Sequence, residues 1–153
     1  MIGTRVRAVA AAAFVALAAC GDDLTGPARS ADLDIARQRW SAARPAEYAY
    51  TLRRSCFCGP EVTRPVQVTV RNGTVVELRY ADTGAPVDQR WAPLFPSIDG
   101  LFAIIDDAVA RRAERLDLEF DATLGHPLKI DIDYSTRLAD EEITYTVLGV
   151  RLP

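Results

Sequence analysis

The chain is poor in residues that bind soft metals or carry reactive thiols. It has three cysteines, one histidine and a single methionine, which is Met1. Soft metal ligands are therefore limited to His126 and the cysteines. The sequence has no glycine-rich phosphate loop after a strand, and no serine or cysteine in a recognisable nucleophile motif. We find no set of residues for a hydrolase, kinase or glycosidase site, and we expect neither enzyme activity nor a cofactor.

Blocks of basic residues and long apolar segments are also missing. Lysine and arginine number 18 against 21 acidic residues, and they are spread along the chain. Nucleic acid is therefore not an expected partner. The Ala-rich apolar run at residues 9–18 is too short to span a bilayer.

This apolar run ends in a sequence typical of bacterial lipoprotein signals. Arg5 and Arg7 precede it, and the tetrapeptide Leu17-Ala18-Ala19-Cys20 closes it. We predict a signal peptide over residues 1–19 and acyl chains, palmitate among them, on Cys20. The alternative is an ordinary signal peptide with a cysteine near its cleavage site.

Cleavage before Cys20 would leave 134 residues with a formal net charge of −5, enough for one domain. Residues 20–31 are polar and predict a flexible tether, in which ten extended residues reach about 33 Å. Residues 32–153 are then one domain in the cell envelope. A lipid anchor would hold this domain on the periplasmic or outer side of a bacterial membrane.

Two helices and six strands are predicted for this domain. Apolar residues recur three or four apart over residues 32–43 and 98–109, and Ser97 is positioned to cap the second helix. Apolar and polar residues alternate over 48–53, 66–70, 76–80, 116–120, 128–134 and 143–147. The predicted fold is α+β, in the order αβββαβββ, with both helices on one face of a mainly antiparallel six-stranded sheet. The order of helices and strands is similar in the two halves, which is consistent with an internal duplication.

The second and third strands should form a hairpin around Asn72-Gly73. A two-residue loop, 72–73, would place the apolar residues after the loop on the opposite face from those before it. A three-residue loop, 71–73, pairs Val68 with Val76 and keeps both apolar sets on one face. We therefore predict a bulged turn with Gly73 at positive φ.

Cys56 and Cys58 are separated by one residue, and export favours their oxidation. Their Cα atoms would lie about 6.6 Å apart in a straight strand, at the upper limit for a disulfide, but Gly59-Pro60 could bend the chain. One interpretation is a local staple that fixes a loop. The other is a thiol–disulfide exchange site, because strain makes such a bond easier to reduce.

An acidic segment near the end of the chain has the spacing of an EF-hand loop. Positions one, three, five, eight and twelve would be Asp131, Asp133, Ser135, Leu138 and Glu142. Position six, however, is Thr136 instead of glycine, and the flanking residues have strand patterns. We interpret the segment as a solvated hairpin with Asp131 and Asp133 on its wet face, and keep calcium binding as an alternative.

Two other groups of titratable residues have simple interpretations. His126 lies between glycine and proline and is predicted to be exposed in a turn. Asp106 and Asp107 should be solvated on the polar side of the second helix.

These residues, in this order, resemble a known family, the bacterial lipoproteins that carry domain of unknown function 6174. The likeness covers nearly all of the chain after the predicted signal. It rests on Trp40, Tyr48-Ala49-Tyr50, Cys56-Phe57-Cys58-Gly59-Pro60, Val68-Thr69-Val70-Arg71-Asn72-Gly73, Ile98 with Leu101-Phe102, Gly125-His126-Pro127, and Asp131-Ile132-Asp133 with Asp140-Glu141.

The resemblance implies export and lipid anchorage, and it supplies no activity, cofactor or catalytic residue. The predicted tether, the sheet with one open face and the missing catalytic residues lead us to expect a non-enzymatic binding module that engages another envelope protein or a cell-wall component. Thiol–disulfide exchange at Cys56 and Cys58 is the first alternative, and calcium binding within residues 131–142 is the second.

Overall fold

The computed structural model describes residues 27–43, 45–135, 137 and 140–153. Cys20 and the predicted signal peptide lie outside these residues. The elements in chain order are α1 (Pro27–Ala43), β1 (Glu47–Cys56), α2 (Pro60–Thr63), β2 (Val66–Arg71), β3 (Thr74–Tyr80), the 3-10 helix η1 (Gln89–Leu94), α3 (Ile98–Ala110), β4 (Arg115–Phe120), β5 (Pro127–Asp133) and β6 (Glu142–Arg151). In the described part, none of the helices has the length and apolar character needed to cross a membrane.

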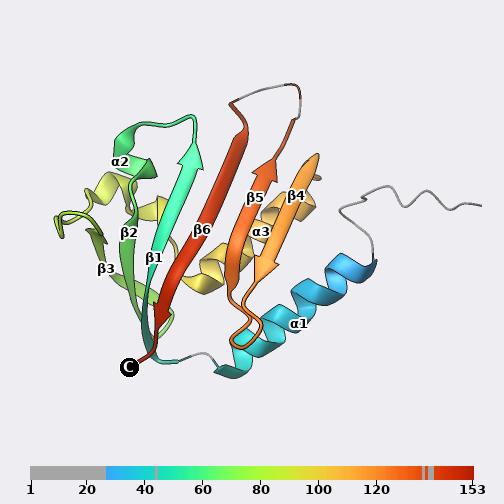
Figure 1. The fold of residues 1–153 in the computed structure, drawn as a ribbon, viewed down its shortest axis with the longest axis horizontal. Helices are drawn as coiled ribbons and strands as arrows, with labels where there is room; N and C mark the ends of the chain where they lie inside the picture. The colour runs from blue at the N-terminus through green and yellow to red at the C-terminus, as the bar shows by residue number, and fades with distance from the viewer. Residues whose placement is uncertain (1–26, 44, 136, 138–139) are drawn as a thin grey trace, which may run out of the picture.

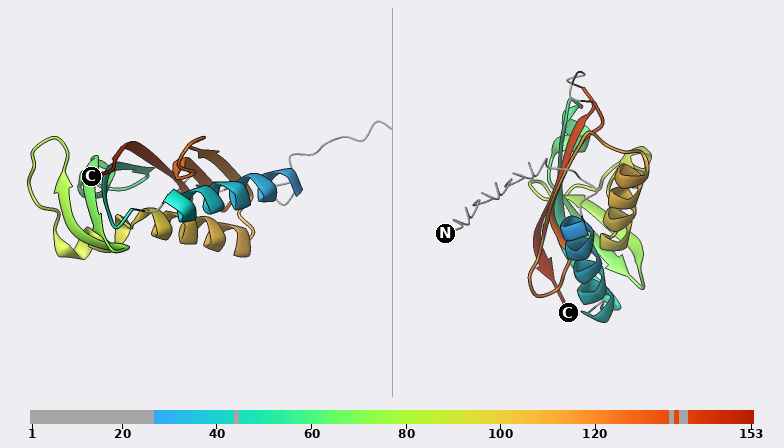
Figure 2. Two further views of the ribbon diagram at one scale, coloured as in Figure 1. Left: turned by 90° about the horizontal axis from the view of Figure 1, so that it is seen from below. Right: turned by 90° about the vertical axis from the view of Figure 1, so that its right-hand side faces the viewer.

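The six strands form one antiparallel sheet in the order β3-β2-β1-β6-β5-β4. Helices α1 and α3 lie on the same face of this sheet, and none of the described helices lies on the other face (Figures 1 and 2). The α+β class and the antiparallel six-stranded sheet are therefore confirmed. The expected element order lacked α2 and η1, because one is a single turn and the other lies in a proline-containing segment that has no helical periodicity.

The strand order differs from what an internal duplication predicts. β1 follows α1 and lies at the centre of the sheet, paired with both β2 and β6. β4 follows α3 and lies at one edge, paired with β5. The two halves therefore place equivalent strands at non-equivalent positions, and the topology does not support a repeated unit.

Helix α1 begins five residues earlier than predicted. The helix starts at Pro27, whereas a tether was expected up to residue 31. Proline is well tolerated in the first turn of a helix, because its fixed φ suits the helix and its missing N–H would be unpaired there. The predicted tether was therefore too long at its C-terminal end.

The core lies between the inner face of the sheet and the two helices. Alternate residues of β1 and β2 are buried, as the sequence pattern predicts. Tyr48 and Tyr50 fix the start of α3 over β1: the Ile98 amide donates to the Tyr48 hydroxyl at 3.1 Å, and the Tyr50 hydroxyl donates to the Pro96 carbonyl. Ser97 caps α3 as predicted, with its Oγ accepting from the Gly100 amide. Burial raises the pKa of Tyr50 well above its ordinary value.

The β2–β3 hairpin has a different register from the predicted one. Asn72 (φ 48°) and Gly73 (φ 77°) both have positive φ and form a two-residue loop, so the predicted three-residue loop is wrong and the positive φ of Gly73 is confirmed. A bulge follows the turn and leaves Val76 exposed. Val68 then pairs with Leu78. The bulge therefore brings apolar residues of β3 opposite those of β2, as the longer loop was expected to do.

Candidate functional site

The structure joins Cys56 and Cys58 in a disulfide at the end of β1. Their Cα atoms are 5.2 Å apart, and the Cys58 amide donates to the Cys56 carbonyl at 2.8 Å. The chain turns there, and α2 begins at Pro60. Phe57, between the two cysteines, has 90% of its surface exposed. The disulfide therefore closes a tight loop with an aromatic side chain at its tip.

Two residues before the disulfide, β1 buries a cation. Arg54 is 7% exposed, and its guanidinium lies over the ring of Tyr145, 5.6 Å from the centroid. The guanidinium Nε and Nη1 atoms have no hydrogen-bond partner among the described residues. The signal for this burial was present in the sequence, because Arg54 follows Leu52 at the spacing of two that defines one face of a strand.

The acidic segment is divided between two strands and is partly neutralised. The Asp131 carboxylate lies 3.6 Å from Arg115 Nη2 and 3.4 Å from Lys129 Nζ. Glu142 Oε1 lies 3.8 Å from the same Arg115 nitrogen. Thr136 and Leu138 lie outside the described residues. Among the residues that are described, no three histidine, cysteine, aspartate or glutamate side chains gather in a way that could hold a metal ion.

Asp133 is only 3% exposed, so its predicted position on a wet surface is wrong. Its Oδ1 accepts from the Ser135 amide at 2.9 Å, and the residue pairs with Arg115 in the β4–β5 register. The carboxylate caps the turn after β5 instead of facing solvent.

His126 is 5% exposed, so its predicted exposure is also wrong. The β4–β5 turn packs on α1, where the imidazole meets the ring of Trp40 edge to face at 6.3 Å. Its Nδ1 lies 3.1 Å from the Pro127 carbonyl oxygen. Asp106 and Asp107 are exposed as predicted, and they pair with Arg37 and Arg111.

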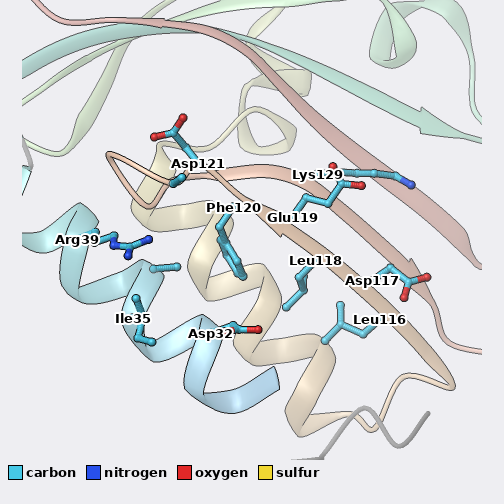
Figure 3. A pocket seen from close by; sticks show the side chains of 12 residues that line it. Asp32, Ile35, Arg39, Leu116, Asp117, Leu118, Glu119, Phe120, Asp121 and Lys129 are labelled. Carbon is cyan, nitrogen blue, oxygen red and sulfur yellow. The ribbon is translucent and has the colours of Figure 1, made fainter. Parts of the chain in front are cut away.

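A groove with a volume of about 760 Å³ runs between α1 and β4 (Figure 3). Ile35 projects from α1 toward the side of β4 that carries Leu118 and Phe120, and these three side chains form an apolar floor. Asp117 and Glu119 project from the opposite side of β4. The groove has no local signal in the sequence, because it depends on how α1 crosses the sheet.

The two edges of the sheet differ. Residues 85–87 cover β3: the Tyr80 amide donates to the Ala85 carbonyl at 2.9 Å, and the Val87 amide donates to the Leu78 carbonyl at 3.1 Å. β4 is the last strand at the other edge, where the groove lies, and it pairs only with β5 among the described elements.

Fold and site together define a class of protein: an α+β domain with one antiparallel sheet, a disulfide-closed loop and a groove beside an edge strand. The chain belongs to the family described as "Family of unknown function (DUF6174)", whose sequence profile matches residues 32–152. The part of the resemblance that concerns this domain family is thus confirmed. Comparison with curated proteins and with solved structures gives no match.

Proposed function

We propose that this protein is a non-enzymatic, lipid-anchored binding module of the bacterial cell envelope, and that it docks on a partner protein through Phe57. The observation that carries the proposal is the 90% exposure of Phe57 in a loop closed by the Cys56–Cys58 disulfide. The lipoprotein-like tetrapeptide ending at Cys20 supports the location.

An exposed aromatic side chain on a constrained loop suits a protein interface. Full burial of a phenylalanine side chain is favourable by about 1.5–3 kcal/mol of free energy. Aromatic residues are also common among the side chains that dominate binding energy. A loop that is already closed loses little conformational freedom when it binds. A partner with an apolar pocket would therefore gain affinity from Phe57 at a low entropic cost.

Acidic charge makes a protein a better partner than a lipid surface for this loop. The chain after the predicted signal carries a formal net charge of −5, and Glu61 lies exposed in α2 directly after the loop. Anionic bilayers attract basic segments and repel acidic ones. The lipid on Cys20 would then restrict the search for the partner to the envelope.

Photo-crosslinking in intact cells tests this proposal. Benzoylphenylalanine at position 57 should give reproducible adducts with a protein, whereas the same probe at Leu148, which is 48% exposed on β6, should not give these adducts. Phe57→Ala should abolish co-purification of that protein, and Val76→Ala, at another exposed apolar residue, should preserve it. Identical adducts at both probe positions, or none at position 57, would contradict the proposal.

Thiol–disulfide exchange is the second candidate function, and the exposure of Cys58 favours it. An incoming thiolate would attack one sulfur, form a mixed disulfide and release the other cysteine as a thiolate. Mass spectrometry after alkylation, with and without mild reductant, measures this reactivity. Exchange predicts that Cys56→Ser/Cys58→Ser abolishes function while Phe57→Ala preserves it. Docking through Phe57 predicts that Phe57→Ala is the more damaging change.

A further inference from the structure

We infer that the groove between α1 and β4 binds an extended peptide, which adds as a strand to the edge of β4 and alternates apolar with basic side chains. This site is separate from the loop at Phe57, and the inference does not depend on the function proposed above. It rests on the edge of the sheet, on the two faces of β4 and on the charge around the groove.

The difference between the edges points to β4 as the acceptor strand. Unpaired backbone groups on an edge strand are a template for another strand, and proteins commonly cover them with a loop. Residues 85–87 cover β3 in this way, through hydrogen bonds to Leu78 and Tyr80. At β4 the corresponding space is a groove with a volume of about 760 Å³, within the range of roughly 300–1,000 Å³ found for ligand sites.

The two faces of β4 determine the pattern of the incoming strand. Ile35, which is 45% exposed, together with Leu118 and Phe120, would contact its apolar side chains. Asp117 and Glu119, on the outer face, would lie beside its alternate side chains. Opposite charges on neighbouring strands stabilise their pairing, so basic residues suit these alternate positions.

The charge around the whole groove agrees with this pattern. Its lining includes four carboxylates, those of Asp32, Asp117, Glu119 and Asp121, against only two cations, Arg39 and Lys129. The Lys129 ammonium also lies 3.4 Å from the Asp131 carboxylate, which offsets its charge. The groove therefore attracts a basic peptide and disfavours an acidic one.

The same residues argue against a second copy of this chain as the occupant. Antiparallel pairing of two β4 strands about Asp117 would place that residue opposite its own copy, with Arg115 opposite Glu119 on either side. Pairing about Leu118 would place Asp117 opposite Glu119. Like charges directly opposite each other destabilise a pair of strands. The outer face of β4 carries one cation, Arg115, against two carboxylates, Asp117 and Glu119, so a second copy would bring further negative charge to an acidic edge.

Binding of synthetic peptides to the full chain in detergent tests the inference by fluorescence anisotropy. The probe is a labelled octapeptide that alternates valine and lysine, with its ends blocked. We expect a Kd below about 1 mM, the upper range of weak specific binding. A matched peptide with glutamate in place of lysine should bind at least tenfold more weakly. The lysine peptide methylated on every second backbone nitrogen should also bind at least tenfold more weakly, because one of its edges then has no N–H groups to pair with β4.

Variants of the protein identify the site. Asp117→Lys/Glu119→Lys should weaken binding of the lysine peptide at least tenfold and allow the glutamate peptide to bind. Ile35→Ser should weaken binding of both the lysine and the glutamate peptide. Val76→Ser, near the covered edge, and Phe57→Ala should leave the Kd unchanged, so a failure of either proposal can be recognised independently.

Three results would overturn the inference. Equal binding of the methylated and unmethylated peptides would show attraction of polycations without strand addition. Full retention of binding in the double-lysine variant would place the peptide elsewhere. A dimer that the double-lysine variant loses would identify a second copy as the occupant.

Discussion

Gly125 lies directly against the backbone of Ala36, so the β4–β5 turn contacts α1 with no side chain between them. A Cβ atom on Gly125 would overlap the Ala36 carbonyl oxygen and would lie 2.7 Å from the Cβ of Arg39. Gly125 also has a φ of +78°, which L side chains rarely adopt. This contact fixes α1 close to β4, and α1 and β4 are the two walls of the groove.

Gly125→Ala should destabilise the protein by about 3 kcal/mol or more, because it combines left-handed strain with overpacking against α1. Gly149→Ala is the matched control: it has a φ of +57° and nothing within 4 Å of the added Cβ, so only the strain of about 1–2 kcal/mol applies. Urea unfolding measures both. Equal losses would show that the turn does not pack on α1 in solution.

The hairpin register can be tested by two substitutions in β3. Leu78→Thr should cost about 1–2 kcal/mol, because Leu78 packs against the core opposite Val68. Val76→Thr should change stability by less than about 0.5 kcal/mol, because Val76 is half exposed in the bulge. Thermal unfolding followed by circular dichroism measures both. The reverse ranking would favour the three-residue loop.

Arg54→Met should preserve or raise stability, by up to about 2 kcal/mol. The substitution removes a buried guanidinium with two unpaired nitrogens and keeps much of the apolar stem. Arg53→Met, on the exposed face of the same strand, is the control and should change stability little. The free energy of unfolding in urea is the measurement. A loss above about 1 kcal/mol for Arg54→Met would mean that the guanidinium has a favourable partner in solution.

Asp121 should make the free energy of unfolding depend on pH in a defined direction. Hydrogen bonds from the Leu124 and Thr123 amides hold the pKa of its carboxyl below the ordinary value of 3.8. The ionised form therefore stabilises the folded state above that value, and the contribution is lost as pH falls through the lower folded pKa. Asp121→Ala should cost about 1 kcal/mol at pH 7. Urea unfolding between pH 7 and pH 2 measures the difference in unfolding free energy between this variant and the wild type. The difference should shrink below pH 4, and a constant difference would contradict this assignment.

Local patterns predicted the secondary structure well, because alternation and helical periodicity depend on neighbours in the sequence. The Ser97 cap and the positive φ of Gly73 are local in the same sense. The buried face of β1 was also readable, but Arg54 lies one residue beyond the predicted strand at 48–53, and charged residues are seldom fully buried.

The errors arose where distant segments meet. His126 is buried because its turn packs on α1, about ninety residues earlier in the chain. Asp133 is buried because β4 pairs beside it and its carboxylate caps the following turn. The order of strands across the sheet, and hence the groove at β4, likewise follows from long-range pairing that a single sequence does not display.

The covered edge at β3 also limits how many chains can join one sheet. Residues 85–87 already occupy backbone groups of Leu78 and Tyr80 at the C-terminal end of β3, so among the described strands β4 offers the longer free edge. A molecule with one acceptor edge takes a single added strand and then presents no second edge of its own. Open-ended growth needs two complementary surfaces on every copy. If strands add only at β4, addition stops after one step, and recognition of an extended chain is then separate from fibre formation.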